Sequence, residues 1–89
     1  MYKLNLTSTA VKNLKDFNHA EGQLIAKKLR YLSENFDALS KSKKVTQLKG
    51  TEFKHYRFVI ARRIRAIFEI NDDGEMILLI LKIGRRKGV

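Results

Sequence analysis

The stretch from residue 53 to residue 83 restricts the possible folds most, because it contains three successive segments with the composition of β-strands. Residues 53–61 and 63–70 are rich in aromatic and β-branched side chains, and the turn signal NDDG precedes residues 75–83. In the middle segment Ile64, Ala66, Phe68 and Ile70 alternate with Arg65, Ile67 and Glu69. Because successive side chains point to opposite faces of a strand, we expect a sheet that buries one face and presents Arg65 on the other.

The last segment ends in MILLILKI (residues 76–83), which is apolar at both odd and even positions until Lys82. This pattern is typical of a strand that is covered on both faces, or that has a partner on one. The basic sequence GRRKGV (residues 84–89) follows directly, so its cations leave the sheet from an anchored point. The longest apolar run is six residues, whereas a membrane-spanning helix needs about 18, and we expect a soluble protein.

The N-terminal part predicts one strand and two helices. The sequence MYKLNL (residues 1–6) alternates with period two, and the hydroxyls that follow it can cap a short helix over about residues 8–17. Asn18 and Glu21 resemble a capping box at the start of a second helix. The apolar positions of that helix have the spacing of one buried face: Ile25, Leu29, Leu32, Phe36 and Leu39. Residues 40–51 are polar and basic and predict a loop.

These segments predict one α+β domain over residues 1–89, in the order strand, helix, helix, strand, strand, strand. We expect a mostly antiparallel sheet with the two helices packed on one face. The aromatic residues Tyr31 and Phe36 are expected to pack in the core or at its boundary. The chain has no cysteine, which excludes disulfides and thiolate metal sites and suits the reducing cytoplasm.

The net charge of +10 is unevenly distributed. Residues 1–37 hold 6 basic and 4 acidic side chains, whereas residues 38–89 hold 13 and 5. A polyanion is the natural partner of such a basic half, since cations that neutralise phosphates release condensed counterions. An acidic protein partner and a merely solubilising surface are the alternatives.

The candidate functional residues are cations rather than metal ligands or a phosphate-binding loop. The five glycines are isolated and there are only two histidines, so no metal and no cofactor is expected. Arg57, Arg65 and Arg86 lie in or beside three successive strands and can converge on a phosphodiester. His55 can act near phosphates as a general acid or base, although a lone strand histidine is more often structural. The further candidates for binding RNA are Lys49, Lys54, His55, Arg62, Arg63, Arg85 and Lys87.

Four motifs together resemble the RelE/ParE superfamily of toxins from toxin–antitoxin modules: QLKG (47–50), HYRF (55–58), IRAIFEI (64–70) and KIGRRKGV (82–89). For RelE-like members the resemblance implies an endoribonuclease that cuts mRNA on the ribosome by attack of a 2′-hydroxyl on the adjacent phosphate. It assigns catalytic arginines to Arg57, Arg65 and Arg86. Two positions depart from the family pattern, because Val59 stands where a second basic residue is expected and the C-terminal tyrosine is missing.

The resemblance also implies a cognate antitoxin. We expect an acidic, partly helical segment that covers the basic face and buries some of Ile77, Leu79 and Leu81. A ParE-like toxin that inhibits DNA gyrase without nuclease activity is the close alternative. A basic RNA- or DNA-binding domain without toxicity is the third.

Overall fold

Five strands form one sheet in the order β1-β5-β4-β3-β2 in the computed structural model, which describes residues 2–48, 55–71 and 76–85. The elements along the chain are β1 (Lys3–Leu6), α1 (Ser8–Lys15), α2 (His19–Glu34), α3 (Phe36–Leu39), β2 (Val45–Gln47), β3 (His55–Ala61), β4 (Ile64–Asn71) and β5 (Ile77–Arg85). Strands β2 to β5 pair antiparallel, and β1 runs parallel to β5. The predicted α+β class and mostly antiparallel sheet are confirmed.

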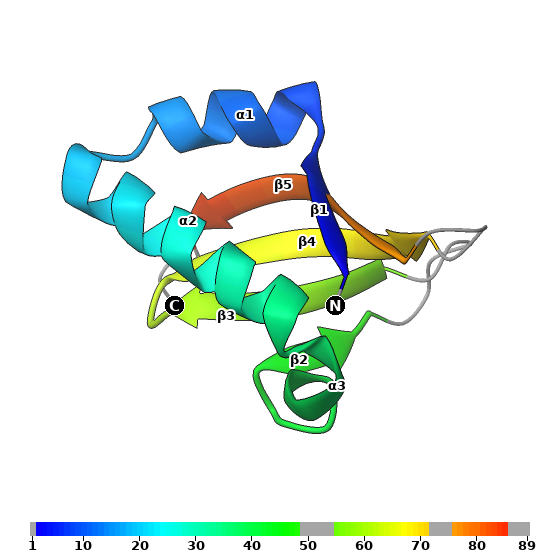
Figure 1. Cartoon of the computed structure of the whole chain (residues 1–89). Helices are drawn as coiled ribbons and strands as arrows, with labels where there is room; N and C mark the ends of the chain where they lie inside the picture. The colour runs from blue at the N-terminus through cyan, green and yellow to red at the C-terminus, as the bar shows by residue number, and fades with distance from the viewer. Residues whose placement is uncertain (1, 49–54, 72–75, 86–89) are drawn as a thin grey trace.

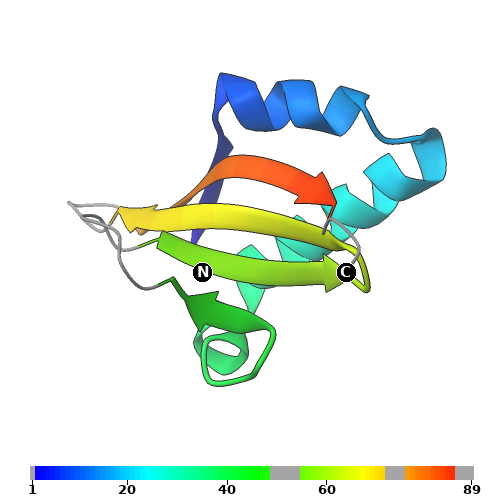
Figure 2. The ribbon, with the colours of Figure 1, turned by 180° about the vertical axis from the view of Figure 1, so that it is seen from behind.

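Only one face of the sheet is covered by helices in the described part of the chain (Figures 1 and 2). On β4 the side chains of Ile64, Ala66 and Phe68 are buried, as the alternation predicts. They pack against the helical stripe Ile25, Leu29, Leu32, Phe36 and Leu39, all of which is buried. Figure 2 shows β3, β4 and β5 from behind, with no helix in front of them. We call this side of the sheet the open face.

The helices begin where the side-chain caps predict. The Thr7 hydroxyl accepts a hydrogen bond from the backbone N–H of Ala10 (3.1 Å), and Asn18 and Glu21 form the predicted capping box. The prediction of a single second helix is wrong at the C-terminal end of that helix. Asn35 has a non-helical conformation (φ −126°) and separates α2 from α3. The buried stripe nevertheless continues across this break.

Two further expectations need correction. The predicted loop over residues 40–51 contains β2, where Val45 pairs with Phe58 of β3 and fills the edge of the core. A strand of three residues with a single buried side chain leaves almost no periodic signal in the sequence. Tyr31 is 47% exposed, so it does not pack in the core, whereas Phe36 does.

Strand β5 is buried on one face and half-buried on the other. Leu78, Ile80 and Ile83 belong to the core, whereas Ile77, Leu79 and Leu81 are partly accessible. Among the described residues it lies between β1 and β4 in the sheet. No helix in the described ranges is both long and apolar enough to cross a membrane.

Helix α1 is fastened to β5 by two side-chain hydrogen bonds. The Thr7 hydroxyl donates a hydrogen bond to the carbonyl of Leu81 (2.8 Å), and the side-chain oxygen of Asn13 accepts one from the backbone N–H of Ile83 (2.9 Å). The β4–β5 register shifts between Ile67 and Phe68, next to these contacts. These bonds hold α1 along the edge of the sheet, beside β5 (Figure 2).

Candidate nucleic-acid interface

Arg57 and Arg65 lie close together on the open face. Arg57 of β3 is opposite Ile67 of β4, and Arg65 of β4 is opposite Val59 of β3. The two arginines are therefore diagonal neighbours on adjacent strands, with backbones about 7–8 Å apart. Both are half-buried, so the surrounding sheet restricts their side chains. Two guanidinium groups that project from neighbouring strands on one face can donate hydrogen bonds to the same phosphodiester.

The guanidinium of Arg57 has an unused donor. Its Nε is inaccessible to solvent, and no described residue accepts a hydrogen bond from it. A buried donor without an acceptor is costly, and more so on a charged group. The described residues thus leave this donor of Arg57 unsatisfied.

A hollow of about 350 Å³ opens beside Arg65, between α1 and the open face. It is lined by Thr9, Asn13, Arg65, Ile67, Lys82, Ile83, Gly84 and Arg85. In the sheet register Arg65 is opposite Gly84, and Ile67 is opposite Lys82. Lys82 is exposed, so a second cation stands diagonal to Arg65 at this site. Neither Lys82 nor the α1 residues were among the residues predicted to bind RNA.

His55 pairs with a carboxylate on the open face. It lies opposite Glu69 in the β3–β4 register, and its Nε2 is 3.7 Å from Glu69 Oε2. Both side chains are partly exposed, at 26% and 34%. Arg57 is two residues further along β3, so it projects from the same face about 7 Å away. The imidazole thus lies beside the arginine pair and faces a carboxylate.

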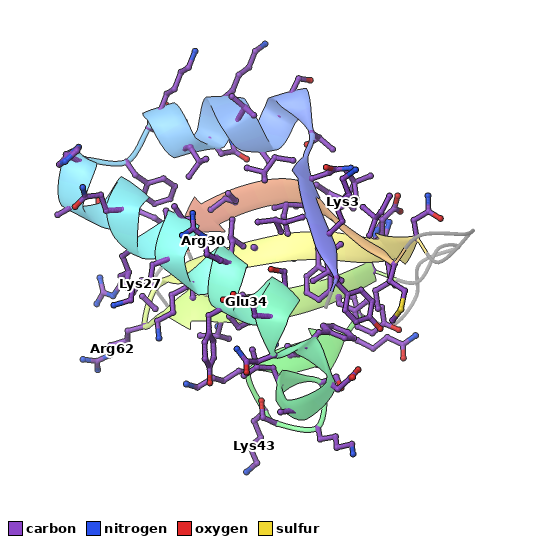
Figure 3. All side chains as sticks on the ribbon, viewed as in Figure 1. Lys3, Lys27, Arg30, Glu34, Lys43 and Arg62 are labelled. Carbon is purple, nitrogen blue, oxygen red and sulfur yellow. The ribbon has the colours of Figure 1, made fainter. Side chains whose placement is uncertain are left out.

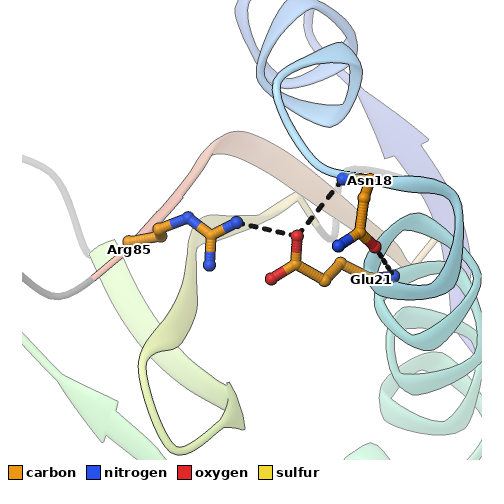
Figure 4. Close-up of polar contacts among 3 residues, drawn as sticks. All are labelled: Asn18, Glu21 and Arg85. Atoms are coloured by element: carbon orange, nitrogen blue, oxygen red, sulfur yellow. Dashed lines mark hydrogen bonds and ion pairs between the residues drawn. The ribbon is translucent and has the colours of Figure 1, made fainter.

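Arg85 is already engaged within the protein, although we predicted that it binds RNA (Figure 4). Its guanidinium donates a 2.7 Å hydrogen bond to Glu21 and lies 4.8 Å from the ring centre of Phe17. The same Glu21 oxygen accepts the backbone N–H of Asn18, so one carboxylate joins the start of α2 to the end of β5. The hydrogen bonds from Arg85 and from the Asn18 backbone lower the pKa of Glu21, and Glu21 in turn raises the pKa of Arg85. Phosphate would have to compete with this carboxylate for Arg85.

The other cations that we predicted to bind RNA or to act in catalysis fall into two groups. Arg62 and Arg63 are exposed at the β3–β4 turn, and Arg62 points away from the molecule (Figure 3). They extend the positive charge of the open face at one end of the sheet. Lys49, Lys54, Arg86 and Lys87 lie outside the described residues, so the predicted convergence of Arg86 on the arginine pair stays a prediction.

A metal centre has no obvious ligand set here. The described residues include no cluster of three or more His, Asp or Glu side chains. The described residues of the open face carry guanidinium, ammonium and imidazole groups. These bind anions, stabilise negative charge and, for the imidazole, transfer protons.

The Glu21–Arg85 ion pair predicts a pH-dependent contribution to stability. Because the pKa of Glu21 is lowered on folding, its contribution is complete above its ordinary value near 4.5 and is lost as the pH falls through the lowered value. The variant Glu21→Gln keeps an acceptor for the Asn18 backbone but removes the charge. We expect it to melt below the wild type at pH 7 and to converge with it as the pH falls through the lowered pKa of Glu21, as measured by thermal unfolding. An equal difference at both pH values would contradict the ion-pair account.

Comparisons with known proteins find the same fold in toxins. The chain matches the crystal structure of the toxin–antitoxin complex RelBE2 from Mycobacterium tuberculosis with a TM-score of 0.77 at 17% identity, covering 96% of this chain and 98% of that one. It matches an archaeal RelE–RelB complex from Pyrococcus horikoshii with a TM-score of 0.74 at 22% identity, covering 99% and 98%. It matches the isolated RelE toxin of E. coli with a TM-score of 0.69 at 14% identity, covering 100% and 88%.

No family model matches the sequence, and no curated protein matches it. The likeness is therefore one of structure, carried by the order and pairing of the elements rather than by overall sequence identity. It extends over nearly the whole chain. The resemblance that the four motifs indicate is thus confirmed at the level of structure, and this chain has the fold of the RelE/ParE toxins.

Proposed function

We propose that this protein is the toxin of a toxin–antitoxin module and cleaves mRNA on the ribosome. The observation that carries the proposal is the position of Arg57 and Arg65, which are diagonal neighbours on the face of the sheet that no described helix covers. The hollow beside Arg65 adds room for a nucleotide next to this pair. The likeness to RelE toxins supports the same conclusion.

The reaction we propose needs charge stabilisation and two proton transfers. The 2′-oxygen of a nucleotide attacks the adjacent phosphorus, the bond from phosphorus to the 5′-oxygen breaks, and the products are a 2′,3′-cyclic phosphate and a 5′-hydroxyl. Negative charge increases on the phosphoryl oxygens in the transition state, and guanidinium groups held in place stabilise it. Arginine is a poor proton donor because its pKa exceeds about 12, so Arg57 and Arg65 act electrostatically.

His55 is our candidate for proton transfer. Val59 occupies a position on the open face where RelE-like members place a basic residue. The imidazole of His55 can remove the proton from the attacking 2′-hydroxyl, and the facing Glu69 carboxylate can stabilise the resulting imidazolium. His55 and Arg57 are two residues apart on β3, so their side chains project from the same face and can reach the same nucleotide.

A cognate antitoxin is the proposed protein partner. Ile77, Leu79 and Leu81 form a half-buried apolar row on the open face, and Lys82 and Arg65 flank it with positive charge. An acidic amphipathic segment matches this combination of apolar contact and charge. Structures with this fold that contain an antitoxin support the assignment. An antitoxin bound here would cover the arginine pair and thereby block RNA.

Replacement of the paired arginines should abolish toxicity. We expect Arg65→Ala and Arg57→Ala each to reduce cleavage about 10²- to 10³-fold, the usual loss when one preorganised donor to a transition state is removed. Cleavage is measured by primer extension on the message from a translation reaction with added protein, and toxicity by growth after induction. Arg30→Ala is the matched control, because Arg30 is an exposed cation on α2, among the helices of the covered face (Figure 3).

The same experiment separates the alternatives. Toxicity that survives both substitutions would contradict the catalytic assignment. DNA breaks without cut transcripts would indicate a gyrase inhibitor of the ParE kind, and salt-sensitive binding without a cut product would indicate a nucleic-acid-binding domain.

Loss of the imidazole should slow the chemical step. We expect His55→Ala to lower the single-turnover cleavage rate about 10²- to 10⁴-fold, the range that general acid–base catalysis contributes. Added imidazole should restore part of the rate for His55→Ala and none for Arg65→Ala, because only the former lacks a proton acceptor. A His55→Ala protein that cleaves at the wild-type rate would exclude His55 from proton transfer.

A further inference from the structure

The hollow beside Arg65 joins two kinds of side chain that a nucleotide requires. From the sheet it receives the cations Arg65 and Lys82 and the apolar side chain of Ile67. From α1 it receives the neutral polar side chains of Thr9 and Asn13. Its volume of about 350 Å³ is at the lower end of the range of small-molecule sites, about 300–1,000 Å³. Cations on one side and neutral hydrogen-bonding groups on the other match a phosphate and a base edge.

The amide of Asn13 has a fixed orientation. Its Oδ1 accepts the backbone N–H of Ile83 at 2.9 Å, and only the oxygen end of the amide can accept this bond. The nitrogen Nδ2 therefore points elsewhere and offers two donors. No described residue accepts a hydrogen bond from it. Asn13 thus presents donors alone, unlike a free asparagine, which presents a donor and an acceptor.

Arg85 does not fill the hollow with a mobile charge, although it is part of the lining. Its guanidinium is held by Glu21 and by the ring of Phe17. Arg65 and Lys82 are accordingly the cations that a phosphate entering the hollow would meet, and they are diagonal neighbours in the β4–β5 register. Arg65 and Lys82 thus form the phosphate-binding side of the hollow, and this side lies next to Arg57.

We propose that this hollow binds one nucleotide of the RNA strand and selects its base. The phosphate contacts Arg65 and Lys82, the base lies against Ile67, and the Nδ2 of Asn13 and the hydroxyl of Thr9 donate hydrogen bonds to the base edge. Because Asn13 offers only donors, the preferred edge consists of acceptors, and guanine provides two adjacent ones in N7 and O6. The inference rests on the proposed function, since it assumes that RNA is the ligand of the open face.

Three substitutions test the site without disturbing the fold. Asn13→Asp keeps the acceptor for the Ile83 N–H but replaces the two donors by an acceptor, which repels an acceptor edge. Gly84→Val fills the hollow, because a Cβ added at Gly84 meets no atom within 4 Å. Gln23→Glu adds the same negative charge as Asn13→Asp at an exposed position of α2 outside the hollow, and serves as the matched control.

The first measurement needs no nuclease activity. Guanosine 5′-monophosphate is titrated into the ¹⁵N-labelled protein, and the amide signals of Asn13, Lys82 and Gly84 should shift more than with the adenosine, cytidine or uridine monophosphates. Asn13→Asp should weaken guanosine monophosphate binding about tenfold, the loss of one good base contact. Gly84→Val should abolish the shifts, and Gln23→Glu should leave them unchanged. Circular dichroism checks that each variant is folded.

The second measurement maps every cut in a translated message. We expect Asn13→Asp to lose cuts next to guanine and retain others, so that the distribution of sites changes and not only their total. Cleavage by the wild type together with unshifted amides and an unchanged cut distribution in Asn13→Asp overturns the inference and leaves the proposed function intact. Localised binding of guanosine monophosphate without any cleavage by the wild type overturns the ribonuclease and leaves the nucleotide site.

Discussion

The burial of one face of the sheet beneath the helices is the constraint on which the rest of the molecule depends. Strand side chains alternate with a period of two, so the same strands that bury Phe58, Ala66 and Phe68 must present Arg57 and Arg65 on the opposite side. A one-residue slip in register would exchange the two sets, placing guanidinium groups in the core at a large cost in free energy. The stability of the core and the position of the arginine pair are thus set by the same pairing.

Helix α1 gives the open face a boundary that the sheet alone would lack. Thr7 and Asn13 bind the backbone of β5, so α1 lies beside the sheet and not over it. The hollow exists because of this arrangement, with α1 on one side and Arg65 and Lys82 on the other. The ion pair of Glu21 with Arg85 closes the same end of the sheet and joins the start of α2 to the end of β5. Polar contacts between distant residues thus position the borders of the hollow, whereas hydrophobic packing positions the sheet beneath it.

Local sequence patterns predicted the elements well, and the site only in part. The buried stripe of α2 and α3 and the alternation of β4 each reflect contact with a single core, and such periodicity is visible in one sequence. The capping box of Asn18 and Glu21 was visible for the same reason, because its partners are three residues apart. Placement of Arg65 on the open face followed from strand parity.

The strand and the site residues that sequence reasoning missed depend on contacts between distant residues. Strand β2 forms only through its pairing with β3, and the partner of Arg85 is 64 positions away. Asn13 resembles any polar helix residue until its bond to Ile83, 70 positions away, is known. Lys82 was read as the end of an apolar run, although the sheet register brings it beside Arg65. A single sequence carries no local signal for such pairs.

The salt dependence of RNA binding tests the central claim most directly. With a short RNA whose 2′-hydroxyls are replaced by hydrogen, so that cleavage is impossible, the slope of log association constant against log salt counts the phosphates that the protein neutralises, at about 0.7 per phosphate for a single strand. The account predicts that Arg57→Ala and Arg65→Ala each reduce the slope by about this amount, whereas Arg30→Ala leaves it unchanged. Equal effects of all three substitutions, or no effect of the first two, would show that RNA does not lie on the open face.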